Sequence, residues 1–178
     1  LAIGTGVASG SGLTVGHELG HKPDWPAQVG AKLVNAVTGY GHFCIEHNRG
    51  HHIMVATPED PASARFGESI YRFALRELPG TARRGWGMER DRLAKKGLPF
   101  WHWRNDLLQG YCITLSVAAA LVLWLGFAIL PFLILHHFVG WLQLTLANYV
   151  EHYGLMRQKL PSGRYKPCQP HHSWNTNH

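Results

Sequence analysis

The stretch ITLSVAAALVLWLGFAILPFLIL, residues 113–135, decides the fold class, because its 23 residues include no charged side chain. That length exceeds the roughly 18 apolar residues that indicate a membrane-spanning helix. The largely apolar composition extends over 111–150, which would form about 60 Å of helix, enough for two bilayer crossings. The sequence therefore predicts a helical hairpin that turns around Pro131, with a single long kinked helix as the alternative.

Two more helices are predicted before this hairpin. Residues 1–16 are small and apolar, which suits close helix packing in a membrane, and this helix should continue to Lys22 and stop at Pro23. Residues 27–45 should form another membrane helix, within a helical stretch that Gly39 and Gly41 can bend. We expect an all-α integral-membrane helical bundle, with 1–178 forming part of one domain that is truncated at both ends.

The polar segment 57–110 separates these helices from the hairpin. Its apolar residues Phe66, Ile70, Phe73 and Leu78 recur at helical spacing and predict an amphipathic helix. Basic residues of this segment contribute to the net charge of +6. Because basic residues beside a membrane span favour the cytoplasmic side, we expect the segment to lie in the cytoplasm. We expect no nucleic-acid partner, because no nucleic-acid motif accompanies the charge. The basic residues concerned are Arg83, Arg84, Arg90, Arg92, Lys95 and Lys96.

Histidines, rather than cysteines, are the candidate metal ligands. The three cysteines have no CxxC spacing, which argues against a disulfide framework and against thiolate sites. Thirteen histidines fall in separate clusters, of which the first is His17-Glu18-Leu19-Gly20-His21. Histidines at i and i+4 lie about 40° apart on a helix and can reach the same metal. This HExxH pattern alone also fits a zinc protease with Glu18 as general base.

The second cluster favours two metal ions. His47 and His51 repeat the i, i+4 spacing, whereas His52 lies about 100° further round a regular helix and should point elsewhere. A single zinc is satisfied by three protein ligands and a water, so ligands in two directions suit two metals. His152 is the third feature, because a polar group at the end of a membrane helix needs a partner. Six histidines without matching aspartates or cysteines favour iron.

Each of these clusters also includes a glutamate. A carboxylate that accepts the second ring N–H of a ligand histidine fixes the orientation of that ring. Neighbours in sequence diverge on a helix, so we expect each glutamate to serve a histidine of another cluster, or to pair with a local arginine. The residues expected to support the ligands in this way are Glu18, Glu46 and Glu151, together with His172, Asn175 and His178 of the terminal cluster.

The remaining histidines have weaker claims. We favour structural roles for His42, His102, His136 and His137, and leave the role of His171 open.

Four segments closely resemble the membrane-bound alkane 1-monooxygenases, a family within the membrane fatty acid desaturase and hydroxylase group. They are HELGHK at 17–22, EHNRGHH at 46–52, NYVEHYGL at 148–155 and PCQPHHSWNTNH at 167–178, and the resemblance covers essentially the whole chain. It implies a multi-pass protein of the bacterial inner (cytoplasmic) membrane, with six membrane helices and a diiron centre facing the cytoplasm. The iron ligands that it implies are His17, His21, His47, His51, His52 and His152.

The resemblance also implies the reaction and its partners. These are the O2-dependent hydroxylation of medium-chain n-alkanes from the bilayer to 1-alkanols, two Fe as cofactor, membrane lipid as surroundings, and electrons from rubredoxin, with rubredoxin reductase upstream. The family's last box, HxxHH, is missing, so we expect a partial ligand set and no activity from this chain alone. A fatty-acid desaturase or other membrane diiron hydroxylase is the main alternative. An intramembrane zinc metalloprotease is another, but it leaves four of the six histidines without a shared purpose.

Overall fold

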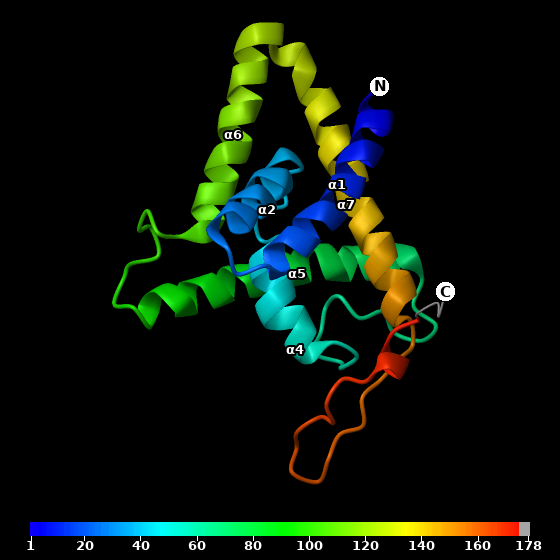
Figure 1. The fold of residues 1–178 in the computed structure, drawn as a ribbon. Helices are drawn as coiled ribbons and strands as arrows, with labels where there is room; N and C mark the ends of the chain where they lie inside the picture. The colour runs from blue at the N-terminus through cyan, green and yellow to red at the C-terminus, as the bar shows by residue number, and fades with distance from the viewer. Residues whose placement is uncertain (175–178) are drawn as a thin grey trace.

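The computed structural model describes residues 1–174 as helices joined by loops (Figure 1). In this range it has no strand, and the one ladder contact is an isolated bridge between Lys159 and Tyr165. The all-α prediction is therefore confirmed.

The apolar hairpin is present, but it turns earlier than expected. Helices α6 (Asp106–Leu125) and α7 (Leu130–His152) are joined at Gly126, which has a φ of 77°, and by the short 3-10 turn η2 (Phe127–Ile129). The prediction of a turn at Pro131 is wrong, because Pro131 lies in the first turn of α7, where its missing N–H costs no helical hydrogen bond.

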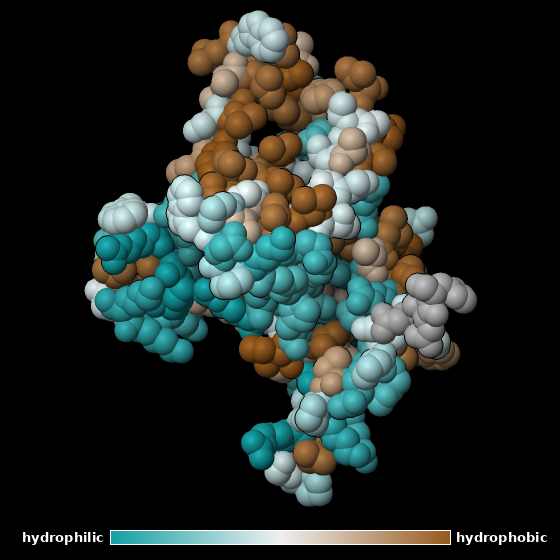
Figure 2. All heavy atoms as spheres, in the orientation of Figure 1, coloured by the Kyte–Doolittle hydropathy of each residue, from teal (hydrophilic) through white to brown (hydrophobic). Residues whose placement is uncertain are grey.

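Both arms of the hairpin are long and apolar enough to cross a membrane. Only 11% of the most apolar window in each span is buried inside the molecule, so their side chains face outward, as those of lipid-facing helices do. Figure 2 shows this apolar surface over the upper part of the molecule, and hydrophilic residues over much of the lower part. These observations support a membrane protein.

Helix α1 (Ala2–His21) packs between α7 and α2 by means of its glycines. A Cβ at Gly6 would lie 2.9 Å from the carbonyl oxygen of His136, and one at Gly16 would lie 2.7 Å from Oδ1 of Asn35. Glycine thus permits close helix contact, as the composition of residues 1–16 predicted.

The single helix expected over 27–45 is interrupted. Helix α2 (Trp25–Val37), capped by Asp24, ends before a turn at Gly39, and the chain resumes as α3 (Phe43–Glu46), the π-helical turn η1 (His47–His51) and the short α4 (His52–Met54). Gly39 has a φ of 68°, a conformation that favours glycine and ends the helix. The expectation of one continuous helix was therefore wrong, although the position of the bend was anticipated.

Helix α5 (Ile70–Ala94) lies across the base of the hairpin (Figure 1). The predicted amphipathic helix is present, but it runs well beyond Leu78, and the apolar stripe is only partly correct, because Phe66 precedes the helix and is 86% exposed. Glu77 and Glu89 are fully buried on the inner face of α5, and both accept hydrogen bonds there, so these polar side chains can lie inside the molecule. That face consists of Phe73, Glu77, Thr81, Gly85, Glu89 and Leu93.

Candidate metal centre

Four histidines converge where the end of α1 meets the π turn. The candidate ligand atoms of His17, His21, His47 and His52 all lie within 4.8 Å of one another. The expectation that His52 points away from His47 is wrong, because η1 is wound more widely than an α-helix. The wider turn brings the residue at i+5 back to the same side, and the ring centroids of His47 and His52 are 4.5 Å apart.

His51 and His152 form a second group beside the first. Their Nε2 atoms are 3.1 Å apart, although the residues lie 101 positions apart in the sequence. The ring of His51 stacks on that of His47, with centroids 5.2 Å apart, and so joins the two groups. The structure therefore brings together all six histidines singled out in the sequence, from three separate stretches of chain.

The geometry of these rings fits metal ligation. The Nε2 atoms of His17 and His21 are 3.0 Å apart, close to the spacing of two ligands on one ion with bonds of about 2.1 Å. The Nε2 atom of His47 is buried and has no hydrogen-bond partner in the described part of the chain. Burial, followed by the neighbouring histidines, lowers the pKa of His47 to about 2. Its ring is therefore neutral, as a metal ligand must be.

Asp60 is the carboxylate that orients the second group. Its Oδ2 atom accepts a hydrogen bond of 2.8 Å from Nδ1 of His51, and it also accepts from the hydroxyl of Ser63 at 2.6 Å. Burial alone would raise the pKa of Asp60, but these hydrogen bonds and the charge of Arg84 hold that pKa well below its usual range. Nδ1 of His51 is thus held by Asp60, and its Nε2 faces Nε2 of His152. Asp60 was not identifiable from the sequence, since a residue in a proline-flanked loop has no ligand spacing that marks it.

A backbone carbonyl orients the other histidine of this group. Nδ1 of His152 lies 3.2 Å from the carbonyl oxygen of His172, in the short turn η3 (Pro170–His172). His172 thus contacts the centre through its main chain, whereas its own Nδ1 accepts from the N–H of Gln169. Asn175 and His178, also proposed as supporting residues, lie outside the described residues.

Within the described residues none of the three glutamates hydrogen-bonds to a histidine of another cluster, and that expectation is corrected. Glu46 accepts hydrogen bonds from Arg84, which is the local-arginine alternative. The exposed side chain of Glu18 bends back to its neighbour, with Oε1 3.1 Å from Nδ1 of His17. Glu151 also lies beside its own neighbour, with Oε1 3.9 Å from Nε2 of His152. A long, partly exposed side chain can reach the adjacent ring, which helix angles alone do not suggest.

The other histidines make contacts elsewhere in the structure. His42 hydrogen-bonds to the hydroxyl of Tyr111, and burial lowers the pKa of His42 to about 4. His136 hydrogen-bonds to Ser9. These contacts agree with structural roles. The contacts of the remaining three are between His102 and the N–H of Arg104, His137 and His136, and His171 and His172.

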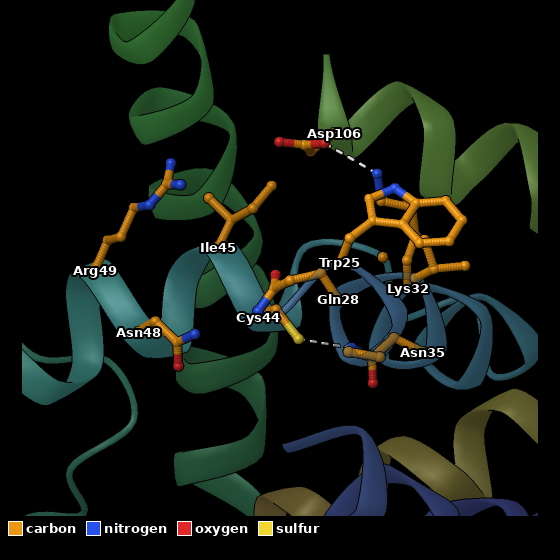
Figure 3. Close-up of a pocket in the computed structure, with 12 residues that line it drawn as sticks. Trp25, Gln28, Lys32, Asn35, Cys44, Ile45, Asn48, Arg49 and Asp106 are labelled. Carbon is orange, nitrogen blue, oxygen red and sulfur yellow. Dashed lines mark hydrogen bonds and ion pairs between the residues drawn. The ribbon is translucent and has the colours of Figure 1, made fainter. Parts of the chain in front are cut away.

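A cavity of about 340 Å³, lined by both polar and apolar side chains, flanks the centre but includes none of the six histidines. It lies between α2, the start of α6 and the segment that leads into the π turn (Figure 3). One of its lining residues, Asn48, donates a hydrogen bond of 2.8 Å to the carbonyl oxygen of Gly20. This bond ties the π turn to the end of α1 and so holds His47 beside His21.

Comparisons with known proteins agree with this geometry. The family model for fatty acid desaturase matches residues 1–178. Over 178 residues the chain is 54% identical to alkane 1-monooxygenase 1 of Alcanivorax borkumensis and 52% identical to alkane 1-monooxygenase of Ectopseudomonas oleovorans. In both cases the match covers 100% of this chain and 44% of the relative.

A more distant relative hydroxylates a different class of compound by name. The chain is 29% identical over 164 residues to the xylene/toluene monooxygenase hydroxylase component of Pseudomonas putida, and the match covers 92% of this chain and 43% of that protein. The chain therefore spans less than half the length of these curated relatives. Because the family model matches the whole of this chain, the chain belongs to the fatty acid desaturase family.

Proposed function

We propose that the intact protein is an alkane 1-monooxygenase, which converts medium-chain n-alkanes and O2 to 1-alkanols. The observation that carries this proposal is the convergence of six imidazoles at one end of two membrane-capable helices. The six histidines would hold two iron ions, which supply the O2-activating redox chemistry that a terminal C–H bond requires. The electrons would come from rubredoxin, reduced by rubredoxin reductase. The site would face the cytoplasm in a bacterial inner membrane.

The residues around the centre would hold the rings in place. Asp60 and the carbonyl of His172 fix the Nδ1 atoms of His51 and His152, so that both Nε2 atoms remain available. Four imidazoles in the first group already exceed the three ligands of a catalytic zinc site, which disfavours the protease alternative.

An apolar cavity of about 260 Å³ is the candidate site for the alkane. It lies between α1, α2, α6 and α7, with His137 on its wall. Ring contacts run from His137 through Trp141, Tyr40 and Phe43 to His47, with centroids 4.9–6.3 Å apart. We expect these aromatic rings to separate the cavity from the centre and to limit how far the chain end advances.

The test uses the full-length protein in native membranes supplied with rubredoxin and its reductase. We expect octane to yield 1-octanol, and metal analysis of the purified protein to give about two irons per chain. One zinc without iron would favour the protease, and desaturated acyl lipid without octanol would favour a desaturase. Hydroxylation of toluene in preference to octane would favour the function named for the more distant relative.

A further inference from the structure

A groove beside the metal centre has an arginine-rich lining. It has a volume of about 560 Å³ and lies between the loop 58–65 and the middle of α5. Arg65, Arg76, Arg83 and Arg84 line it together with Leu75, three prolines, Gly80 and one acidic residue, Glu59. Glu59 accepts a hydrogen bond from the hydroxyl of Tyr165.

The arginines of this groove divide into two kinds. Arg76 and Arg84 are partly buried and paired, Arg76 with Glu68, and Arg84 with Glu46 and Asp60. Arg65 and Arg83 are exposed, and so is Arg72, which lies one turn of α5 before Arg76 but outside the groove lining. Their guanidinium groups make no hydrogen bond or ion pair within residues 1–174. These three positive charges are therefore free to meet an external partner.

Exposed apolar side chains accompany the free arginines. Tyr71 and Leu75 are each 80% exposed on the same stretch of α5. Arginine and aromatic residues are enriched in the energetically important parts of protein interfaces. The groove thus has the composition of a protein docking site.

Two consecutive hydrogen bonds connect Arg84, which lines the groove, to His51 of the metal centre. Arg84 donates to Oδ1 of Asp60 at 2.6 Å, and Oδ2 of Asp60 accepts from His51 at 2.8 Å. A molecule seated in the groove is therefore separated from a proposed iron ligand by two side chains. Neither of the other two cavities described above is connected to a histidine ligand through such a paired arginine.

We propose that this groove docks a small acidic electron-carrier protein, which reduces the metal centre. The proposal rests on the proposed function. In that reaction one C–H bond and O2, with two electrons and two protons, give one C–OH and one water. A one-electron carrier supplies the two electrons in two successive deliveries, each of which oxidises one reduced carrier molecule by one electron. Negative charges around the carrier's redox centre would meet Arg65, Arg72 and Arg83, and this attraction raises the rate of association.

The test is charge reversal in the full-length protein, reconstituted in neutral phospholipid nanodiscs, with rubredoxin as the probe. The variant Arg65→Glu/Arg72→Glu/Arg83→Glu leaves the paired Arg76 and Arg84 in place. We expect its KM for rubredoxin to rise at least tenfold at low salt, with kcat at saturation and iron content within about twofold of wild type. Added salt should raise the wild-type KM and have little effect on that of the variant.

The matched control is Arg90→Glu/Lys95→Glu/Lys96→Glu, which makes the same change of charge among exposed residues at the end of α5. Its KM should change less than threefold. Equal effects of the two triple variants, or an unchanged KM in the groove variant, would overturn the proposal. A dependence of wild-type turnover on anionic lipid that only the groove variant loses, with KM unchanged, would overturn it in favour of a membrane contact.

Binding of rubredoxin to the nanodiscs, measured without alkane, separates the two proposals. If wild type binds rubredoxin and the groove variant does not, while neither makes octanol, the docking site stands and the proposed function fails. If wild type makes octanol and the groove variant retains both binding and KM, the function stands and the docking site fails.

Discussion

The two groups of histidines differ in how their rings are held. In the first group His21 and His52 are exposed, and the contact to a carboxylate is made by the exposed side chain of Glu18. In the second group both rings are buried, and both Nδ1 atoms are fixed, by Asp60 and by the carbonyl of His172. The rings of the second group are therefore fixed by the protein itself, whereas the exposed rings of the first group are held less firmly.

His47 is the residue on which both groups depend. Its ring contacts His17, His21 and His52 of the first group and stacks on His51 of the second. We expect His47→Ala in the full-length protein to abolish turnover and to reduce iron from about two ions per chain to a small fraction of one. Metal analysis and octanol formation measure the two effects.

The matched control for this change is His102→Ala, since the ring of His102 lies outside the cluster, where it accepts a hydrogen bond from the N–H of Arg104 and packs beside Trp103. It should retain wild-type iron. If His47→Ala also retains wild-type iron and activity, the ligand assignment is wrong.

Asp60 tests whether the second group is indeed the oriented one. Loss of a carboxylate that holds a ligand histidine typically weakens metal binding by about 10- to 100-fold. We expect Asp60→Asn to weaken iron retention by that factor, because the side chain loses the charge that His51 and Arg84 face. Iron remaining after dialysis against a graded chelator measures the effect, and Mössbauer spectra should show one of the two iron sites depleted first.

The matched control for Asp60→Asn is Asp91→Asn. Asp91 is exposed, and its only ion pair in the described chain is a 3.5 Å contact with Arg90. It should leave iron retention unchanged. Equal loss from both iron sites in Asp60→Asn would show that the second group depends on Asp60 no more than the first does.

Local patterns predicted most of the fold, and spacing singled out five of the six histidines, whereas His152 was singled out by its place at the end of a membrane helix. How the rings are grouped was not predicted. The positions of α1 and of the two hairpin arms follow from hydropathy and from proline or glycine signals. The π turn has no such signal. In the structure Gly50 of this turn lies against α5, where a Cβ would lie 2.7 Å from Nε of Arg84. Contacts between segments this far apart in the sequence cannot be predicted from local spacing.

The buried carboxylates were not predictable for the same reason. Asp60 and Glu77 are both fully buried, and their partners lie on distant segments or in irregular loops. A sequence shows that a residue can ionise, but not that the fold will enclose it. The turn of the hairpin was misplaced because proline is tolerated in the first turn of a helix, whereas Gly126 actually reverses the chain.

Glu77 links the helix that carries His152 to α5. It accepts hydrogen bonds from Thr145 at 2.8 Å and from Asn148 at 3.1 Å, one turn before His152 on α7. Burial raises the pKa of Glu77 to about 7, and the nearby charge of Glu46 also raises it, whereas the Thr145 and Asn148 hydrogen bonds and the charge of His51 lower it. The folded protein therefore holds this proton at a pH where the unfolded chain has released it.

The sign of the pH dependence follows from that difference. The contribution of Glu77 to stability is fully present below about pH 4.5 and is lost as the pH rises through about 7, a change of about 3 kcal/mol at 1.36 kcal/mol per pH unit. We expect Glu77→Gln, which cannot ionise, to flatten the dependence of the unfolding temperature between pH 5 and 8. Glu77→Ala should lower that temperature at both values, since Thr145 and Asn148 lose their acceptor. A wild-type protein that becomes more stable over this range would contradict the assignment.

Glu18 gives the smallest expected effect and the sharpest contrast with Asp60. Its side chain is 75% exposed, and an exposed pair of this kind contributes about 0.2–1 kcal/mol, which corresponds to at most a few-fold change in affinity. Glu18→Gln retains a carbonyl oxygen that can accept from His17, so octanol formation and iron content should stay within about threefold of wild type. A zinc protease would instead lose its general base with this substitution. A loss of octanol formation of more than 100-fold would therefore show that Glu18 takes part in the reaction. Glu18 would then matter more than Asp60, and the exposed side of the centre would be the one that requires a fixed proton acceptor.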